Sequence, residues 1–160
     1  MNAVGVDSLG DLVWTRGAPL QDWSEDRIEE AHQLILETAG ESYEPTRLRG
    51  LPTDPDFGNW VLLDAGELVG ILWSMRLSDH RARVLAFSVD TSLQGDGYGT
   101  LAWSLFRDAA RGAGMRVVQL EVRHDNEIAL GMYERRGLRP RGSLKGFYRG
   151  LDGWLMLGPL

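Results

Sequence analysis

Cysteine is absent from this sequence, so neither a disulfide nor a thiolate metal site can form. The three histidines, His32, His80 and His124, are not spaced like metal ligands, and we expect no metal. Basic residues are also in deficit, with 17 Lys and Arg against 23 Asp and Glu, a net charge of −6. This balance argues against non-specific nucleic-acid binding. The longest apolar stretch, around residues 68–75, is far shorter than a membrane span.

The overall composition is typical of a soluble globular protein. Hydrophobic residues make up 43% of the chain and charged residues 25%. The first twelve residues include Asp7 and Asp11 and lack an apolar run, so they do not predict a signal peptide. We therefore expect one domain over residues 1–160, located in the cytoplasm.

Hydrophobic periodicity and turn residues predict the order of the elements. Strands are predicted at 11–16, 59–64, 68–77, 83–90, 115–123, 138–144 and 153–157. Helices are predicted at 100–113, at 126–136, and from a capping box at Asp22–Glu25 to Gly40. A loop over 41–57, rich in proline and glycine, has room for one short helix. This order predicts an α/β (α+β) fold with one mixed sheet and helices on both faces.

A glycine-rich turn lies between an apolar strand and an amphipathic helix. Its residues are Gln94, Gly95, Asp96, Gly97, Tyr98, Gly99 and Thr100. Glycine permits positive φ and removes the Cβ atoms that would block a ligand. The backbone N–H groups then face one concavity at a helix N-terminus, where an anion such as a pyrophosphate is favoured. A turn that uses glycine for geometry alone is the alternative.

Two other phosphate-binding loops compete for this segment. A P-loop requires lysine before Thr100, where this chain has Gly99, so that interpretation fails. Residues 97–102 do match a dinucleotide fingerprint, with Glu121 as the acidic residue that follows. However, Glu121 lies inside its predicted strand, and only about 40 residues come after that strand. A dinucleotide-binding enzyme is therefore a distant alternative.

Two short motifs, separated by a helix and a strand, resemble the signatures of the GNAT superfamily of N-acetyltransferases. The first, in the spacing Q/R-x-x-G-x-G/A, consists of Gln94, Gly97 and Gly99. The second consists of Asn126, Ala129, Tyr133 and Gly137. The resemblance covers about residues 60–158. It implies a mostly antiparallel sheet of about seven strands, acetyl-CoA as the acetyl donor and an amine acceptor.

A narrower resemblance points to the acceptor. Residues 120–126 and 146–148 resemble the ribosomal-protein-alanine and other protein N-terminal acetyltransferases. The chain departs from them at 83–89, which lacks their usual glutamate, and at Gly153–Trp154, where they carry Asp-Ala. The acceptor implied is a peptide N-terminus, with a small-molecule amine left open. A GNAT-fold module that binds acyl-CoA for regulation, without catalysis, is the alternative from another functional class.

The resemblance also implies roles for individual residues. Backbone groups of Phe87, Ser88 and Val89 would pair with the pantetheine, and an N–H near Val89 would donate to the thioester oxygen. Asn126, Ala129 and Tyr133 are spaced to lie on one helix face. Asn126 suits the N-cap, a cofactor contact or both. Tyr133 is the candidate general acid for the coenzyme A sulfur, with a packing tyrosine as the alternative.

Glu121 is the candidate general base. It alternates with Gln119 and Arg123 along the predicted strand, so these three side chains share one sheet face. A carboxylate in mid-sheet is costly unless it is paired or functional. A base for the acceptor amine and an ion pair with a nearby arginine are both open. Asp90 and Tyr148 are the reserve candidates.

The C-terminal segment is locally basic and aromatic. Its cations are Arg139, Arg141, Lys145 and Arg149. They could meet the 3′-phosphate of coenzyme A or an acidic substrate, but the favoured interpretation is solvated residues that protect a strand edge. Its aromatic residues, Phe147, Tyr148 and Trp154, permit a homodimer.

Overall fold

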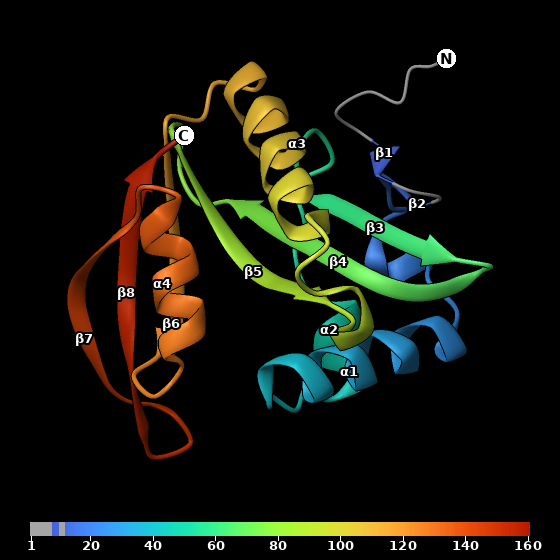
Figure 1. Cartoon of the computed structure of the whole chain (residues 1–160), viewed down its shortest axis with the longest axis horizontal. Helices are drawn as coiled ribbons and strands as arrows, with labels where there is room; N and C mark the ends of the chain where they lie inside the picture. The colour runs from blue at the N-terminus through green and yellow to red at the C-terminus, as the bar shows by residue number, and fades with distance from the viewer. Residues whose placement is uncertain (1–7, 10–11) are drawn as a thin grey trace.

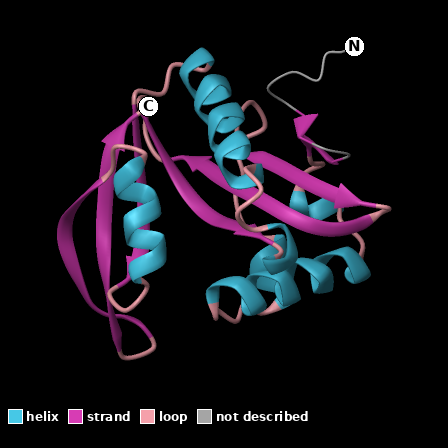
Figure 2. Cartoon of the chain, in the orientation of Figure 1, coloured by secondary structure: helices cyan, strands magenta, loops and turns pink. Residues whose placement is uncertain are grey.

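The computed structural model describes residues 8–9 and 12–160, as one twisted sheet with helices on both faces (Figures 1 and 2). Within these residues the sheet has eight strands in the order β1-β2-β3-β4-β5-β6-β8-β7. The strands are β1 (Ser8–Leu9), β2 (Leu12–Arg16), β3 (Asn59–Asp64), β4 (Glu67–Arg76), β5 (Arg81–Val89), β6 (Val117–Arg123), β7 (Arg139–Tyr148) and β8 (Leu151–Pro159). Neighbouring strands are antiparallel except for the parallel pair β5 and β6.

The expected mixed, mostly antiparallel sheet is therefore confirmed. Its seven expected strands correspond to β2 through β8, and the two-residue β1 is an addition. Asp11, the predicted start of the first strand, lies outside the described residues. So do positions 1–7 and 10, on which the signal-peptide prediction rests in part.

The helices are α1 (Glu25–Ala39), α2 (Pro45–Arg49), α3 (Tyr98–Gly112) and α4 (Glu127–Arg135), with short 3₁₀ turns η1 (Leu20–Asp22) and η2 (Thr91–Leu93). The predicted capping box at Asp22 was wrong. Asp22 is taken up by η1, and Ser24 becomes the N-cap of α1, its hydroxyl accepting from the N–H of Arg27. Gly40 ends α1 as expected, at φ 68°.

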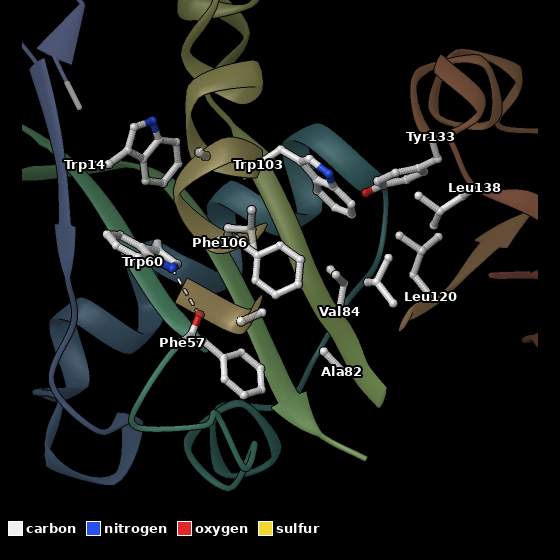
Figure 3. Close-up of a cluster of buried hydrophobic side chains, with 14 of the residues drawn as sticks. Trp14, Phe57, Trp60, Ala82, Val84, Trp103, Phe106, Leu120, Tyr133 and Leu138 are labelled. Atoms are coloured by element: carbon white, nitrogen blue, oxygen red, sulfur yellow. Dashed lines mark hydrogen bonds between the residues drawn. The ribbon is translucent and has the colours of Figure 1, made fainter. Parts of the chain in front are cut away.

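Two hydrophobic clusters lie on opposite faces of the sheet. One joins α1 and α2 to β3 and β4 through residues such as Ile28, Leu48 and Trp73. The other packs α3 and α4 against the opposite face, and Figure 3 shows its aromatic centre around Trp103 and Phe106. Helices therefore cover both faces of the sheet.

The parallel pair β5 and β6 separates soon after it begins. The strands pair only where Arg81 to Arg83 lie beside Val117 to Gln119. On the other side, the register of β4 and β5 shifts, so that Leu85 is an extra, bulged residue. Figure 1 shows the two strands spreading into a V beyond this point. On the side of β6, the backbone of 84–89 is therefore not paired with a strand.

Candidate active site

A cavity of about 630 Å³ occupies the opening between β5 and β6. At one end it is lined by the glycine-rich turn and the start of α3, and at the other by the segment after α1. One side of α4 forms a further wall. Of the predicted site residues, those that line it are Phe87, Ser88, Val89, Gln94, Gly95, Gly97, Gly99, Thr100, Glu121, Asn126, Ala129 and Tyr133. The structure thus brings together residues from four separate elements.

The glycine-rich turn has the geometry of an anion-binding site. Gly95 and Gly97 adopt φ of 88° and 91°, which disfavour any residue with a Cβ. Gly97 is the N-cap of α3, so no side-chain hydrogen bond caps this helix end, and its first turn holds no acidic residue. The helix therefore presents its positive dipole end directly to the cavity.

Not every residue of the turn faces the cavity. The ring of Tyr98 is buried on the α3 side of the sheet, and its carbonyl accepts from the indole N–H of Trp14. Asp96 is exposed and does not line the cavity. Gln94 does line it, and its amide donates to the carbonyl of Val89 at 2.9 Å. That bond ties the turn to the end of β5, so Gln94 has a structural role whatever else it contacts.

Helix α4 brings Asn126, Ala129 and Tyr133 to the cavity on one face, as their spacing predicted. Asn126 is the N-cap, and its Oδ1 accepts from the N–H of Ala129 at 3.1 Å. Tyr133 is buried, with its ring 5.8 Å from that of Trp103 (Figure 3). Burial raises the pKa of the Tyr133 hydroxyl above its ordinary value of 10.0, so it stays protonated at neutral pH.

Glu121 forms an ion pair with Arg83. Arg83 donates from Nε and Nη2 to one carboxylate oxygen at 3.0 and 2.8 Å, and Gln119 donates to the other at 3.2 Å. Of the two interpretations left open by the sequence, the ion pair is therefore present. A role as base remains a prediction, and one acceptor site stays open on the oxygen that Gln119 contacts.

A second carboxylate, which the sequence did not single out, lies at the same end of the cavity. Glu41 is half-buried in the segment after α1, and burial raises the pKa of its carboxyl. It accepts a hydrogen bond from the hydroxyl of Tyr43 at 3.2 Å, and burial raises the pKa of that tyrosine to about 12. Tyr148 also lines the cavity, and its pKa is raised by burial and by the nearby charges of Glu41 and Glu121.

The remaining candidates lie elsewhere. The Asp90 carboxylate accepts from the backbone and hydroxyl of Ser92, which lowers its pKa, and it does not line the cavity. The four basic residues of the C-terminal segment do not line it either. The cations that do are Arg123, Arg135 and Arg136. Over residues 8–9 and 12–160, no cluster of three or more potential metal ligands occurs, and no described helix is long and apolar enough to cross a membrane.

Comparison with known proteins places this geometry in context. The model of the "Acetyltransferase (GNAT) family" matches residues 20–138. The N-alpha-acetyltransferase RimI of Mycobacterium tuberculosis is 36% identical over an alignment of 96 residues, and the alignment covers 57% of this chain. The matched region spans 59% of the length of that relative.

Two solved structures share the fold over nearly the whole chain. Ard1 from Thermoplasma volcanium gives a TM-score of 0.81 at 24% identity, covering 93% of this chain and 97% of the other. The ribosomal-protein-S18-alanine N-acetyltransferase from Escherichia coli gives 0.75 at 18% identity, covering 92% and 93%. At these identities the likeness establishes the fold. That fold differs from the doubly wound parallel sheet that a dinucleotide-binding enzyme requires.

Proposed function

The chain belongs to the acetyltransferase (GNAT) family, and on that premise we propose that it transfers an acetyl group from acetyl-CoA to the α-amine of a protein N-terminus. Transfer occurs by direct attack of the amine in a ternary complex. One observation carries the proposal: a single cavity joins the anion-binding turn at Gly95 and Gly97 to a polar end at Glu41 and Tyr148, with Tyr133 also in its lining.

The part of the cavity lined by the glycine-rich turn and the start of α3, which we call the donor end, suits a long, anionic thioester. Acetyl-CoA supplies the activated acetyl group. The amides at the start of α3 bind its diphosphate, because glycine leaves room at that helix end. The backbone edge of β5 that no strand pairs with, from Phe87 to Val89, binds the pantetheine, and an N–H near Val89 donates to the thioester oxygen.

Tyr133 donates a hydrogen bond to the sulfur that leaves as a thiolate. With reference pKa values near 10 for tyrosine and about 8.5 for a thiol, full proton transfer is uphill by roughly 2 kcal/mol. Burial raises the pKa of Tyr133 further, which makes complete transfer still less favourable. Its contribution is therefore that of a neutral donor that stabilises the developing negative charge.

Two carboxylates, Glu41 and Glu121, are candidates to accept the proton of the attacking amine, and we assign this role to Glu41. No described cation lies within 4.0 Å of the Glu41 carboxylate, and its burial favours the protonated form. Glu121 is held by Arg83 and Gln119 in the ground state. Glu121 is the alternative base, acting directly or through water, and it also adds negative charge that favours an incoming ammonium group.

The amine chemistry favours an N-terminus over a lysine side chain. An α-amine with a reference pKa near 8 is about 10% neutral at pH 7, whereas a lysine near 10.4 is neutral to less than about 0.1%. One modest base is sufficient for the first and inadequate for the second. The likeness to RimI of Mycobacterium tuberculosis, which is named as an N-alpha-acetyltransferase, supports the same acceptor.

The test measures acetyl-CoA binding and thiol release separately. Acetyl-CoA should raise the melting temperature as the linkage relation requires, and peptides with a free N-terminus should release coenzyme A. Matched peptides with a blocked N-terminus and an internal lysine are the control. Release with small amines alone would overturn the N-terminal acceptor. Binding without release from any peptide or amine would identify a regulatory module instead.

A further inference from the structure

Arg136 connects two helices across the donor end of the cavity. It is the C-cap of α4, and its Nη1 donates to the carbonyl of Met132 at 3.1 Å. Its Nη2 reaches the hydroxyl of Thr100, in the first turn of α3, at 3.5 Å. Both Arg136 and Thr100 line the cavity. The guanidinium therefore lies beside the same helix end that the glycine-rich turn opens.

This guanidinium is half-buried, and no residue in the described part of the chain provides a counter-ion for it. Its Cζ lies 5.8 Å from the centre of the Trp103 ring, which covers part of it. Among the described residues no carboxylate lies within 4.0 Å of it. Burial lowers the pKa of Arg136, and the neighbouring charge of Arg135 acts in the same direction. An arginine nevertheless stays protonated in proteins, so the positive charge is present.

The surroundings make this charge unfavourable in the absence of a ligand. The N-terminus of α3 carries the positive end of the helix dipole, and its first turn contains no acidic residue to offset it. Arg136 adds a second positive group next to Thr100, the third residue of that helix. Two positive groups held together at a partly buried position are stabilised when an anion lies between them.

We infer that Arg136 is the counter-ion of the cofactor's diphosphate, contributed by α4 to a site otherwise built by the first turn of α3. This inference rests on the proposed function. The planar guanidinium fork suits two phosphate oxygens at once. The backbone N–H of Arg136 donates to the carbonyl of Tyr133 at 3.0 Å, so a ligand that holds Arg136 also fixes the turn of α4 that carries Tyr133.

The experiment compares affinities for coenzyme A and for 3′-dephospho-coenzyme A by calorimetry. Arg136→Gln should weaken both by a similar factor, about 10- to 100-fold, because both ligands keep the diphosphate. The same variant should lose part of the salt dependence of the dissociation constant, which a purely structural role would leave unchanged. Arg141→Gln is the matched control, since it removes one exposed cation of β7 that does not line the cavity, and it should bind like the wild type.

Three results would contradict the inference in distinguishable ways. Wild-type affinity in Arg136→Gln would remove Arg136 from the site. A loss with coenzyme A alone would assign Arg136 to the 3′-phosphate. An unchanged salt dependence would make its role structural. Should Arg136→Gln not fold, Arg136→Lys keeps the charge without the fork and should give an intermediate affinity. Failure of the wild type to bind coenzyme A would instead overturn the proposed function.

Discussion

Arg83 directs two donors, Nε and Nη2, at a single oxygen of Glu121, while Gln119 holds the other oxygen. Arg83 lies at the last paired position of β5, immediately before that strand separates from β6. The ion pair therefore spans the closed end of the V in which the cavity lies. It holds the Glu121 carboxylate in place at the polar end of the cavity, near Glu41 and Tyr148, which we call the acceptor end. It also connects the two strands whose separation creates the site.

Loss of Arg83 should destabilise the protein through the charge that it leaves behind. The Glu121 side chain is only 10% exposed, and Arg83→Met deprives it of its cation. We expect the free energy of unfolding to fall by about 2 kcal/mol, because the substitution removes one partner of a partly buried, hydrogen-bonded ion pair. The measurement is urea unfolding of both single variants and of Arg83→Met/Glu121→Gln. The double variant should lose less than the sum, whereas strictly additive losses would show that the pair is not coupled.

Tyr133→Phe should separate chemistry from binding. The substitution keeps the ring against Trp103 and removes the hydroxyl, so acetyl-CoA affinity should change by less than about twofold while turnover falls about 10- to 100-fold. Because burial raises the pKa of Tyr133, the wild-type rate should show no alkaline decline from its ionisation below pH 10. Turnover equal to that of the wild type would remove Tyr133 from catalysis.

The half-buried carboxyl of Glu41 should make stability depend on pH. Because its pKa is raised in the native state, the native protein holds this proton more tightly than the unfolded chain does. Glu41 favours the native state most at pH values below its ordinary pKa of 4.5, where the carboxyl is protonated. This contribution to the free energy of unfolding is lost as the pH rises through the raised native pKa. Glu41→Gln should therefore be more stable than the wild type at pH 7, with the difference vanishing near pH 4, as measured by denaturant unfolding.

The same variant tests the assignment of the base. If Glu41 accepts the amine proton, Glu41→Gln should remove the carboxylate's own contribution to the acidic limb of the kcat/KM profile. The part due to the peptide α-amine, whose pKa is near 8, should remain, and Glu121→Gln should leave both parts in place. The reverse pattern would assign the proton to Glu121. Peptide and acetyl-CoA concentrations must be varied independently, so that a change in acceptor binding is not mistaken for a change in chemistry.

Sequence patterns predicted the fold and the conformation of the glycine-rich turn well, because both depend on local signals. Hydrophobic periodicity located the strands and helices. The glycines at 95 and 97 indicated the positive φ that this turn adopts before the uncapped N-terminus of α3. The start of α1 was missed by two residues. Asp22 and Ser24 both carry side-chain acceptors, and only the 3₁₀ turn at Leu20–Asp22 decides between them.

The acceptor end was harder to predict, since its geometry is tertiary. That Arg83 rather than another arginine meets Glu121 depends on the register of β5 and β6, which no local pattern encodes. Glu41 lies in a loop, where the direction of a side chain is set by packing against distant strands. A glutamate two residues before Tyr43, directly after a helix C-cap, is too ordinary a pattern to have identified it.

Gly97→Ala should damage the anion-binding turn. A residue with a Cβ at φ 91° costs about 1–2 kcal/mol, and the methyl group lies at the helix end where we propose that the diphosphate binds. We expect acetyl-CoA affinity to fall at least about tenfold with a lower melting temperature. Gly112→Ala, at the far end of α3 with nothing within 4 Å of the new methyl, is the control and should be stabilised by about 0.5–1 kcal/mol. Unchanged affinity in Gly97→Ala would place the diphosphate elsewhere.

Gly153 permits the close approach of Tyr148 to β8, and its replacement should affect the acceptor alone. A Cβ at Gly153 would lie 2.8 Å from Cε2 of Tyr148 and 3.2 Å from the carbonyl oxygen of Val122, so the tyrosine ring must move. Gly153→Ala should therefore raise the peptide KM about five- to tenfold while acetyl-CoA affinity stays within about twofold. Gly142→Ala on the adjacent β7 meets nothing within 4 Å and should behave like the wild type. A peptide KM that is unchanged in Gly153→Ala would show that Tyr148 does not contact the acceptor, and a parallel loss of acetyl-CoA affinity would show that the strand itself had shifted.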